Sequence, residues 1–272
     1  MKIMHGVKIA AWASIILFLL GCSTVSITER RQLTLIPRGQ ILTLSLDQYK
    51  QFIAEHDVIT GTEQAAMVQR VGERIRSAVE QYMRDQGDAE ALNSYRWEFN
   101  LIDDDSVNAF AMPGGKVVVF SGILPVAQND TGLAVVLGHE IAHVVARHGN
   151  ERMSQALVAQ LGGAALDIAL ANQPQATRQL FMQAYGMGSQ VGVLLPYSRL
   201  QESEADRLGL VFMAMAGYDP RSAAAFWQRM DAQAKGDAPP EFLSTHPAHQ
   251  TRIQDIRDHL PEALKYYRPR KG

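Results

Sequence analysis

A short apolar stretch near the middle of the chain carries three titratable residues at close spacing. Residues 133–144 are otherwise apolar or glycine, yet they include His139, Glu140 and His143. On an α-helix, residues four apart are offset by about 40°, so the two imidazoles point in the same direction one turn apart. Burying such groups is costly unless they bind something. The stretch therefore predicts a buried helix whose polar side chains share a ligand.

A zinc ion suits these side chains. Two histidine nitrogens at this separation can reach one Zn²⁺ at about 2.0–2.1 Å. Glu140 lies on the adjacent flank, where it can take a proton from a zinc-bound water. We predict one Zn²⁺ per chain, with His139 and His143 as ligands and Glu140 as the catalytic base. The bare pattern also occurs by chance on surface helices, but the apolar surroundings favour a metal site.

A catalytic zinc needs a third protein ligand and an open fourth position. His148 follows His139 by nine residues, about 180° around a continuous helix, so we expect it to face away from the metal unless the helix has ended, as a surface or C-terminal-turn histidine. Glu202 and Asp206 are better candidates because they are four apart, on one face of another predicted helix. One carboxylate can ligate zinc while the other orients a ligating imidazole. A solvated acidic face is the alternative, but the apolar run 208–216 that follows indicates a buried helix.

The N-terminus has the pattern of an export signal. Lys2 and Lys8 precede an apolar stretch at residues 9–20, which is too short to favour a spanning helix. The sequence that ends this stretch, Leu-Leu-Gly-Cys at 19–22, also resembles a bacterial lipobox. We therefore predict a lipoprotein signal peptide at residues 1–21 and lipidation of Cys22. A plain cleaved signal and an uncleaved N-terminal anchor are the alternatives.

The predicted lipid would tether the mature chain to a membrane. Ser23 after the cysteine resembles lipoproteins that are directed to the outer membrane. We expect a periplasmic, lipid-anchored protein, with the outer membrane as its location. The net charge of −2 gives no electrostatic case for nucleic acid as a partner. A single cysteine excludes an intramolecular disulfide and a cysteine zinc cluster.

The 272 residues suit one or two domains, and the periodicity favours one. We predict a lipidated N-terminus and linker at 22–50, a catalytic domain at 51–260 and a C-terminal tail at 261–272. Thr62 is expected to cap a long helix. Further segments are predicted from alternation and from helical spacing. They are strands near 97–101, 108–111 and 116–120, and helices near 130–149, 151–171, 177–194 and 198–216, with two more that open at Pro220 and Pro247.

The expected fold class is α+β, mostly α, with a small antiparallel sheet packed on the metal-binding helix. Pro113-Gly114-Gly115 predicts a tight hairpin in this sheet. The apolar stretches 156–171 and 184–196 are interrupted by polar residues, so we expect packing helices rather than membrane spans.

Two motifs together resemble a known family. His-Glu-x-x-His at 139–143 and Glu-x-x-Ala-Asp at 202–206 are similar to those of the HtpX/BepA/LoiP group of bacterial zinc metallopeptidases, related to the CAAX prenyl proteases and the mitochondrial Oma-type protease. The resemblance extends over about residues 53–259 and includes Asn-Ala-Phe-Ala-x-Pro-Gly-Gly at 108–115 and Thr-His-Pro at 245–247. Integral-membrane relatives carry several spanning helices, so this chain resembles the soluble periplasmic branch more closely.

The resemblance implies a gluzincin-like zincin fold and assigns several roles. It implies that Glu202 is the third zinc ligand and that Asp206 supports catalysis. His246 could donate to the oxyanion, or occupy the fourth zinc position and hold the enzyme latent; a plain helix start is the third interpretation. Arg252 could brace His246 or the substrate.

Three residues before the metal-binding helix complete the set. By the same comparison, Asn108, Ala109 and Phe110 are expected to bind substrate, since an extended peptide can add to the edge of the sheet there.

These observations predict a zinc-dependent metalloendopeptidase. Its expected substrates are unfolded or misassembled envelope proteins, with outer-membrane proteins as candidates. The alternative is a periplasmic chaperone or assembly factor for outer-membrane proteins in which proteolysis is secondary or latent. A non-proteolytic zinc hydrolase has the same ligands, but a peptide-lining strand disfavours it.

Overall fold

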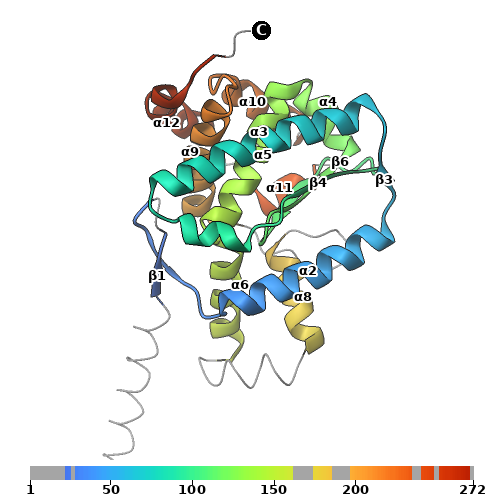
Figure 1. Ribbon diagram of the computed structural model, residues 1–272, viewed down its shortest axis with the longest axis vertical. Helices are drawn as coiled ribbons and strands as arrows, with labels where there is room; N and C mark the ends of the chain where they lie inside the picture. Colours follow the sequence, from blue (N-terminus) through green and yellow to red (C-terminus); the bar gives the residue numbers. More distant parts are fainter. Residues whose placement is uncertain are drawn as a thin grey trace, which may run out of the picture.

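A computed structural model describes residues 22–25, 28–161, 174–185, 197–234, 240–247 and 251–269. Figure 1 shows a small sheet enclosed by helices. The elements before the metal-binding helix are β1 Cys22–Thr24, β2 Arg31–Leu33, α2 Arg38–Glu55, β3 Val58–Ile59, α3 Glu63–Asp85, η1 Ala89–Ser94, β4 Glu98–Ile102, β5 Ala109–Met112, β6 Lys116–Phe120, η2 Ser121–Ile123 and α4 Leu124–Ala127. The remaining elements are α5 Asp130–Val145, α6 His148–Leu161, α8 Pro174–Ala184, α9 Arg199–Met215, α10 Ser222–Ala234, α11 Phe242–Thr245 and α12 Arg252–Tyr266.

The predicted fold class is confirmed, with one correction to the sheet. The four strands are ordered β3-β4-β6-β5, and β5 and β6 form the expected hairpin. Gly114 and Gly115 have φ of 86° and 85°, which glycine adopts without strain. The sheet is mixed rather than antiparallel, because β4 pairs with β6 in parallel. The chain between β4 and β5 crosses to the far side of β6, so β5 becomes an edge strand and β4 runs beside β6.

Both faces of the sheet are buried, each in its own core. Val117 and Val119 of β6 belong to the larger core, which α3, α5, α9, α10 and α12 share. Val118 and Phe120 alternate with them and belong to a second core with α2, α6 and α8. The sheet therefore lies between α3 and α2, as Figure 1 shows. The predicted cap of α3 is confirmed, since the Ala65 amide donates to Oγ1 of Thr62 at 3.1 Å.

The N-terminal part of the chain is folded against the rest. The segment expected to be a linker up to residue 50 contains β2 and most of α2. Tyr49 and Phe52 of α2 are buried in the second core. Its buried stripe also includes Ser45 and Gln48, so the apolar pattern is too weak to reveal the helix. The predicted signal peptide lies outside the described residues.

In the described part of the chain, no helix is long and apolar enough to cross a bilayer. Parts of the stretches 156–171 and 184–196, for which packing helices were expected, fall outside the described residues.

The metal-binding helix α5 contacts α9 through two glycines. A Cβ atom added to Gly138 would lie 2.8 Å from the carbonyl oxygen of Gly209. A Cβ atom added to Gly209 would lie 2.9 Å from the backbone nitrogen of His139. The missing side chains let the two backbones touch. This contact brings the polar residues of α5 and α9 to one point in the core.

Candidate metal centre

Helix α5 presents the first three site residues. Asn129 caps its start, where Oδ1 accepts hydrogen bonds from the amides of Thr131 and Gly132, both at 3.0 Å. The helix is buried along its length, and His139, Glu140 and His143 are each 2% exposed. The sequence expectation of a buried helix with three titratable groups is confirmed.

Helix α9 supplies the carboxylates. Ser198 and Gln201 form a capping box that fixes its first turn. Oε1 of Glu202 lies 3.3 Å from Nε2 of His143, and its Oε2 lies 3.6 Å from Nε2 of His139. Oδ1 of Asp206 instead meets the other nitrogen of His139, Nδ1, at 2.9 Å. The two acids therefore have different positions: Glu202 faces the Nε2 atoms and Asp206 lies behind His139.

His246 completes a cluster of four. It follows the short helix α11, and its Nδ1 lies 3.0 Å from Oε1 of Glu202. One donor atom each from His139, His143, Glu202 and His246 lies within 4.8 Å of the others, and all four residues are buried. Two or three imidazoles with one carboxylate are a donor set that suits Zn²⁺. These residues could hold a metal ion.

An orphaned atom beside the cluster also fits a metal. Oε1 of Glu140 is buried and makes no hydrogen bond. Burial raises the pKa of Glu140 to about 8, and the negative charge of Glu202 adds to the effect. A buried acceptor left unpaired is costly, which is consistent with a missing polar partner at this point.

Burial favours the neutral form of two of the imidazoles, the form that binds a metal. Burial lowers the pKa of His143 and of His246. The carboxylate of Asp206 can only accept, so Nδ1 of His139 carries its proton and Nε2 keeps a lone pair that faces the cluster. Such a partner behind a ligating histidine fixes its tautomer and orientation.

Arg252 links the two carboxylates. Its Nη1 lies 2.6 Å from Oε2 of Glu202, and its Nη2 donates to Oδ1 of Asp206 at 2.9 Å. The guanidinium stacks 3.3 Å from the ring centre of Trp227. Burial alone would raise the pKa of Glu202, but the charge of Arg252 holds it well below its usual range. Arg252 thus keeps a buried acid ionised within the cluster.

His148 is not one of the four clustered residues, as expected, but the surface position expected for it was wrong. It is fully buried, and its Nδ1 lies 2.8 Å from Nδ1 of His143. Helix α5 ends at Val145, and Arg147 has a φ of 59°, so the chain turns before α6 begins. The 100° rotation per residue of a continuous helix does not apply across this turn. The turn instead places His148 behind His143, against its Nδ1.

Two aromatic contacts were missed by the sequence analysis. The ring of Tyr197 lies 3.8 Å from that of His143 and 4.9 Å from that of His246, measured between centroids. The guanidinium of Arg152 lies 3.3 Å from the Tyr197 ring centre. Tyr197 directly precedes the capping box of α9, which is the one local signal that places it near Glu202.

The predicted substrate residues occupy the sheet edge. Ala109 and Phe110 are on β5, and no strand in the described part of the chain pairs with its outer side. The Asn108 amide oxygen accepts a hydrogen bond from the Ala109 nitrogen at 2.9 Å, and Phe110 is buried in the second core. Arg252, also expected at the substrate, contacts the carboxylates described above. The side chain of Cys22 lies outside the described part.

A helix-borne His-Glu-x-x-His with a carboxylate from a second helix, beside a small sheet, defines a zincin-type site. Comparison with known proteins agrees with this class. The model of peptidase family M48 matches residues 69–260. The chain therefore belongs to peptidase family M48, and the expectation of a metallopeptidase is confirmed at the level of the family.

Named relatives come from mitochondria and from bacteria. The chain is 42% identical to the mitochondrial metalloendopeptidase OMA1 of Schizosaccharomyces pombe over 63% of its own length and 49% of that protein. It is 33% identical to human metalloendopeptidase OMA1 over 88% of its length and 46% of that protein. A putative beta-barrel assembly-enhancing protease of Vibrio cholerae is 37% identical over 64% of this chain and 36% of that protein. The chain thus spans about half or less of these relatives.

Proposed function

We propose that the chain is a zinc-dependent metalloendopeptidase whose ligands are His139, His143 and Glu202. The observation that carries this proposal is the buried four-residue cluster, in which the Nε2 atoms and the Glu202 carboxylate converge on one point. When bound there, Zn²⁺ would supply Lewis-acid activation of a water molecule and of a peptide carbonyl. Asp206 and Arg252 would hold His139 and Glu202 in place.

Glu140 is the proposed general base. Its Oε1 is buried at the edge of the cluster, 3.3 Å from Nε2 of His246. From this position the ionised carboxylate could exchange a proton with a water molecule bound at the cluster. In the proposed reaction it accepts a proton from the attacking water as the C–O bond forms. It then delivers that proton to the amide nitrogen as the C–N bond breaks. Glu140 thus accepts and returns one proton, so its carboxylate is ionised again at the end of the reaction.

The edge strand β5 is the proposed substrate-binding element. In an antiparallel pair, alternate residues turn their backbone groups away from the partner strand. The Phe120 amide donates to the Asn108 carbonyl at 3.1 Å, so Phe110 also pairs with β6 while Ala109 and Ala111 direct backbone groups outward. An extended peptide could bind to the Ala109 carbonyl and to the Ala111 backbone through main-chain hydrogen bonds, while the Ala109 amide donates to the Asn108 side chain. This mode favours unfolded segments over folded proteins as substrates.

The cellular setting is part of the same proposal. Export, lipidation at Cys22 and a periplasmic location at the outer membrane rest on the N-terminal sequence pattern. Unfolded or misassembled envelope proteins, outer-membrane proteins among them, are the proposed substrates. Bacterial relatives named beta-barrel assembly-enhancing proteases support this choice. A Cys22→Ala variant that still fractionates with outer membranes and still incorporates labelled fatty acid would contradict the lipid anchor.

The decisive experiment for the catalytic proposal uses Glu140→Gln. We expect this variant to keep one zinc per chain and to lose proteolysis of an unfolded protein by at least 10²-fold. Glu73→Gln, on the exposed surface of α3, is the matched control and should keep full activity. Full activity in Glu140→Gln would refute the mechanism.

The same variant separates the protease from the chaperone alternative. A chaperone would prevent aggregation of an unfolded outer-membrane protein equally well as wild type, Glu140→Gln and chelator-treated protein. A protease would degrade that substrate as wild type only. Comparing aggregation and fragment release in the same samples distinguishes the two functions.

A further inference from the structure

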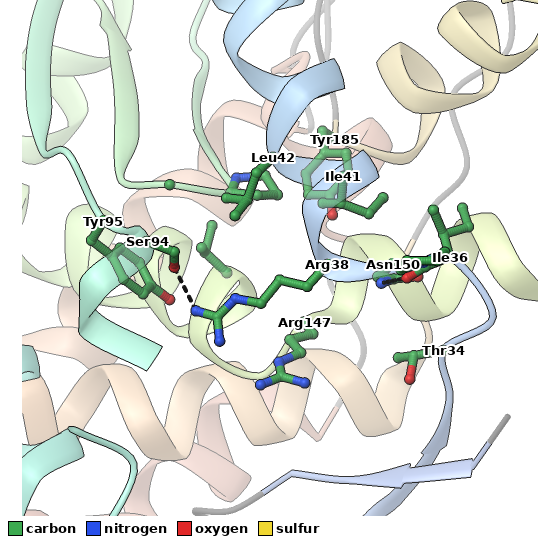
Figure 2. A pocket seen from close by; sticks show the side chains of 14 residues that line it. Thr34, Ile36, Arg38, Ile41, Leu42, Ser94, Tyr95, Arg147, Asn150 and Tyr185 are labelled. Atoms are coloured by element: carbon green, nitrogen blue, oxygen red, sulfur yellow. Dashed lines mark hydrogen bonds between the residues drawn. The ribbon is translucent and has the colours of Figure 1, made fainter. Parts of the chain in front are cut away.

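Residues 28–36, which we call the N-terminal segment, pack behind the metal centre. The amide of Leu35 donates to Oγ of Ser154, and Nδ2 of Asn150 donates to the carbonyl of Ile36, both at 2.9 Å. Figure 2 shows Ile36 and Asn150 beside a cavity of about 220 Å³ at the turn between α5 and α6. The segment therefore lies directly against the turn that follows the predicted ligand helix.

Arg30 of this segment lies between two buried carboxylates. Its Nε donates to Oε2 of Glu204 at 2.5 Å. Its Nη1 and Nη2 donate to the two oxygens of Glu151 at 2.8 and 2.7 Å. The side chains of Glu151 and Glu204 are only 7% and 5% exposed. A paired arrangement of this kind stabilises acids that would be costly to bury alone.

Two further groups complete the surroundings of these acids. The hydroxyl of Thr28, from the same N-terminal segment, donates to Glu204. Nε2 of Gln201 donates to Glu151 at 2.7 Å. The acid that Arg30 and Thr28 share, Glu204, stands two residues after Glu202 on α9. The N-terminal segment therefore contacts the same helix that supplies the proposed third ligand.

Glu204 in turn contacts a histidine that reaches the metal cluster. Its Oε2 lies 2.9 Å from Nε2 of His148. Because a carboxylate only accepts, Nε2 of a neutral His148 carries the proton and its Nδ1 keeps a lone pair. That Nδ1 lies 2.8 Å from Nδ1 of His143, which must then donate. The remaining nitrogen of His143, Nε2, is left with a lone pair directed at the cluster.

The contacts from Glu204 through His148 to His143 resemble the contact of Asp206 with His139. There, a carboxylate acts directly on the ligating imidazole; here, Glu204 acts through an intervening His148. Arg30 fixes the carboxylate that fixes His148. Outer partners of a ligating histidine affect metal affinity because they set its tautomer and its orientation.

We propose that Arg30 is a positioning residue of the metal centre, acting through Glu204 and His148 to hold His143 in the tautomer whose Nε2 ligates the metal. The inference rests on the proposed function only in taking His143 as a ligand. The N-terminal segment, residues 28–36, would then support the zinc site from behind. Displacing this segment would weaken metal binding without touching a ligand.

The test measures zinc affinity by chelator competition in full-length wild type, Arg30→Ala, His148→Gln and the double variant. We expect each single change to lower the affinity about 10-fold. Because both act along one line of contacts, the double variant should lose little more than either single variant. The d–d absorption of Co²⁺-substituted protein should shift in Arg30→Ala, which a purely structural role would not cause. Arg30→Lys, which keeps the charge, should recover part of the affinity.

Two matched controls separate positioning from general anchoring. Arg31→Ala changes the exposed neighbour of Arg30 and should leave zinc affinity unchanged. Glu151→Gln weakens the other contact of Arg30, so it should lower the thermal stability of the metal-free protein with little effect on zinc affinity. Equal losses of zinc affinity in Glu151→Gln and Arg30→Ala would overturn the proposal, and so would wild-type affinity in Arg30→Ala.

The same measurements keep the two proposals distinct. Absence of zinc binding by the wild type would refute the proposed function itself. Zinc binding that His143→Ala abolishes and Arg30→Ala leaves unchanged would refute only the role of Arg30. Additive losses in the double variant would also refute it, since Arg30 and His148 would then act independently.

Discussion

Nε2 of His246 lies 3.3 Å from Oε1 of Glu140, while Nδ1 of the same ring lies 3.0 Å from the Glu202 carboxylate. His246 is 2% exposed, and its ring is stacked on those of Tyr197 and Phe242. One imidazole thus contacts both the proposed base and the proposed third ligand. We propose that His246 holds the enzyme latent rather than donating to the oxyanion, because one ring contacts both Glu140 and Glu202.

Replacing His246 with alanine should therefore activate the enzyme. Removing the ring would free Glu140 from its contact with His246 and would leave His139, His143 and Glu202 to hold the metal. If the closed arrangement outweighs the open one about tenfold, kcat for an unfolded substrate should rise on the order of 10-fold. Steady-state proteolysis and metal analysis of the same preparation provide the measurement.

The control for this variant is His246→Ala combined with Glu140→Gln, which should be inactive. Activity in the double variant would indicate a contaminating protease. A fall in kcat with unchanged zinc content in His246→Ala would instead identify His246 as an oxyanion donor.

Asp206 and His139 provide a second prediction. Asp206→Ala removes the acceptor at Nδ1 of His139, so the imidazole no longer has a fixed tautomer. We expect zinc affinity to fall by about 10- to 100-fold. Competition with a chromophoric chelator measures the affinity. Asp85→Ala, at the exposed end of α3, is the control and should bind zinc like the wild type. Equal affinities for all three proteins would exclude a supporting role for Asp206.

The sequence predicted the parts of the site that depend on local spacing. His139, Glu140 and His143 are held together by one helix, so their geometry follows from their order. The pairing of α5 with Glu202 and His246 spans about 60 and 100 residues, and no periodicity encodes it. For those residues the resemblance to a family supplied what spacing could not.

Two failures have specific physical causes. The position of His148 depends on the positive φ of Arg147. The surrounding sequence does not predict this backbone conformation, because no glycine or asparagine stands at that position. The α2 helix has buried polar residues on its inner face, because Ser45 donates to the Pro113 carbonyl and Tyr49 donates to Glu98. A helix that packs through hydrogen bonds has a weak hydrophobic pattern, so the sequence suggested a linker.

Metal removal should measurably destabilise the fold. The cluster gathers buried carboxylates and imidazoles at one point, and a ligand that binds only the folded state stabilises it by mass action. Zinc at 100 times its dissociation constant should raise the free energy of unfolding by about 2.7 kcal/mol. Denaturant titrations with zinc and with chelator measure the difference.

Ligand variants decide whether this stabilisation comes from the proposed site. Glu140→Gln should keep the zinc-dependent difference, because Glu140 is not a proposed ligand. His143→Ala should lose it. An unchanged zinc effect in His143→Ala would place the bound metal elsewhere in the protein.

The contact between α5 and α9 gives the last prediction. In Gly209→Ala the new methyl group would lie 2.9 Å from the His139 backbone nitrogen, and the nearest atoms are backbone, which cannot rotate away. The helices must separate, which should cost about 1–3 kcal/mol of stability. Because Glu202 and His139 lie on opposite sides of this contact, zinc affinity should fall with it. Gly39→Ala, with nothing within 4 Å of its Cβ, should leave zinc binding unchanged and stabilise α2 by about 0.5–1 kcal/mol. Loss of stability without loss of zinc affinity in Gly209→Ala would show that the ligands adjust independently of helix spacing.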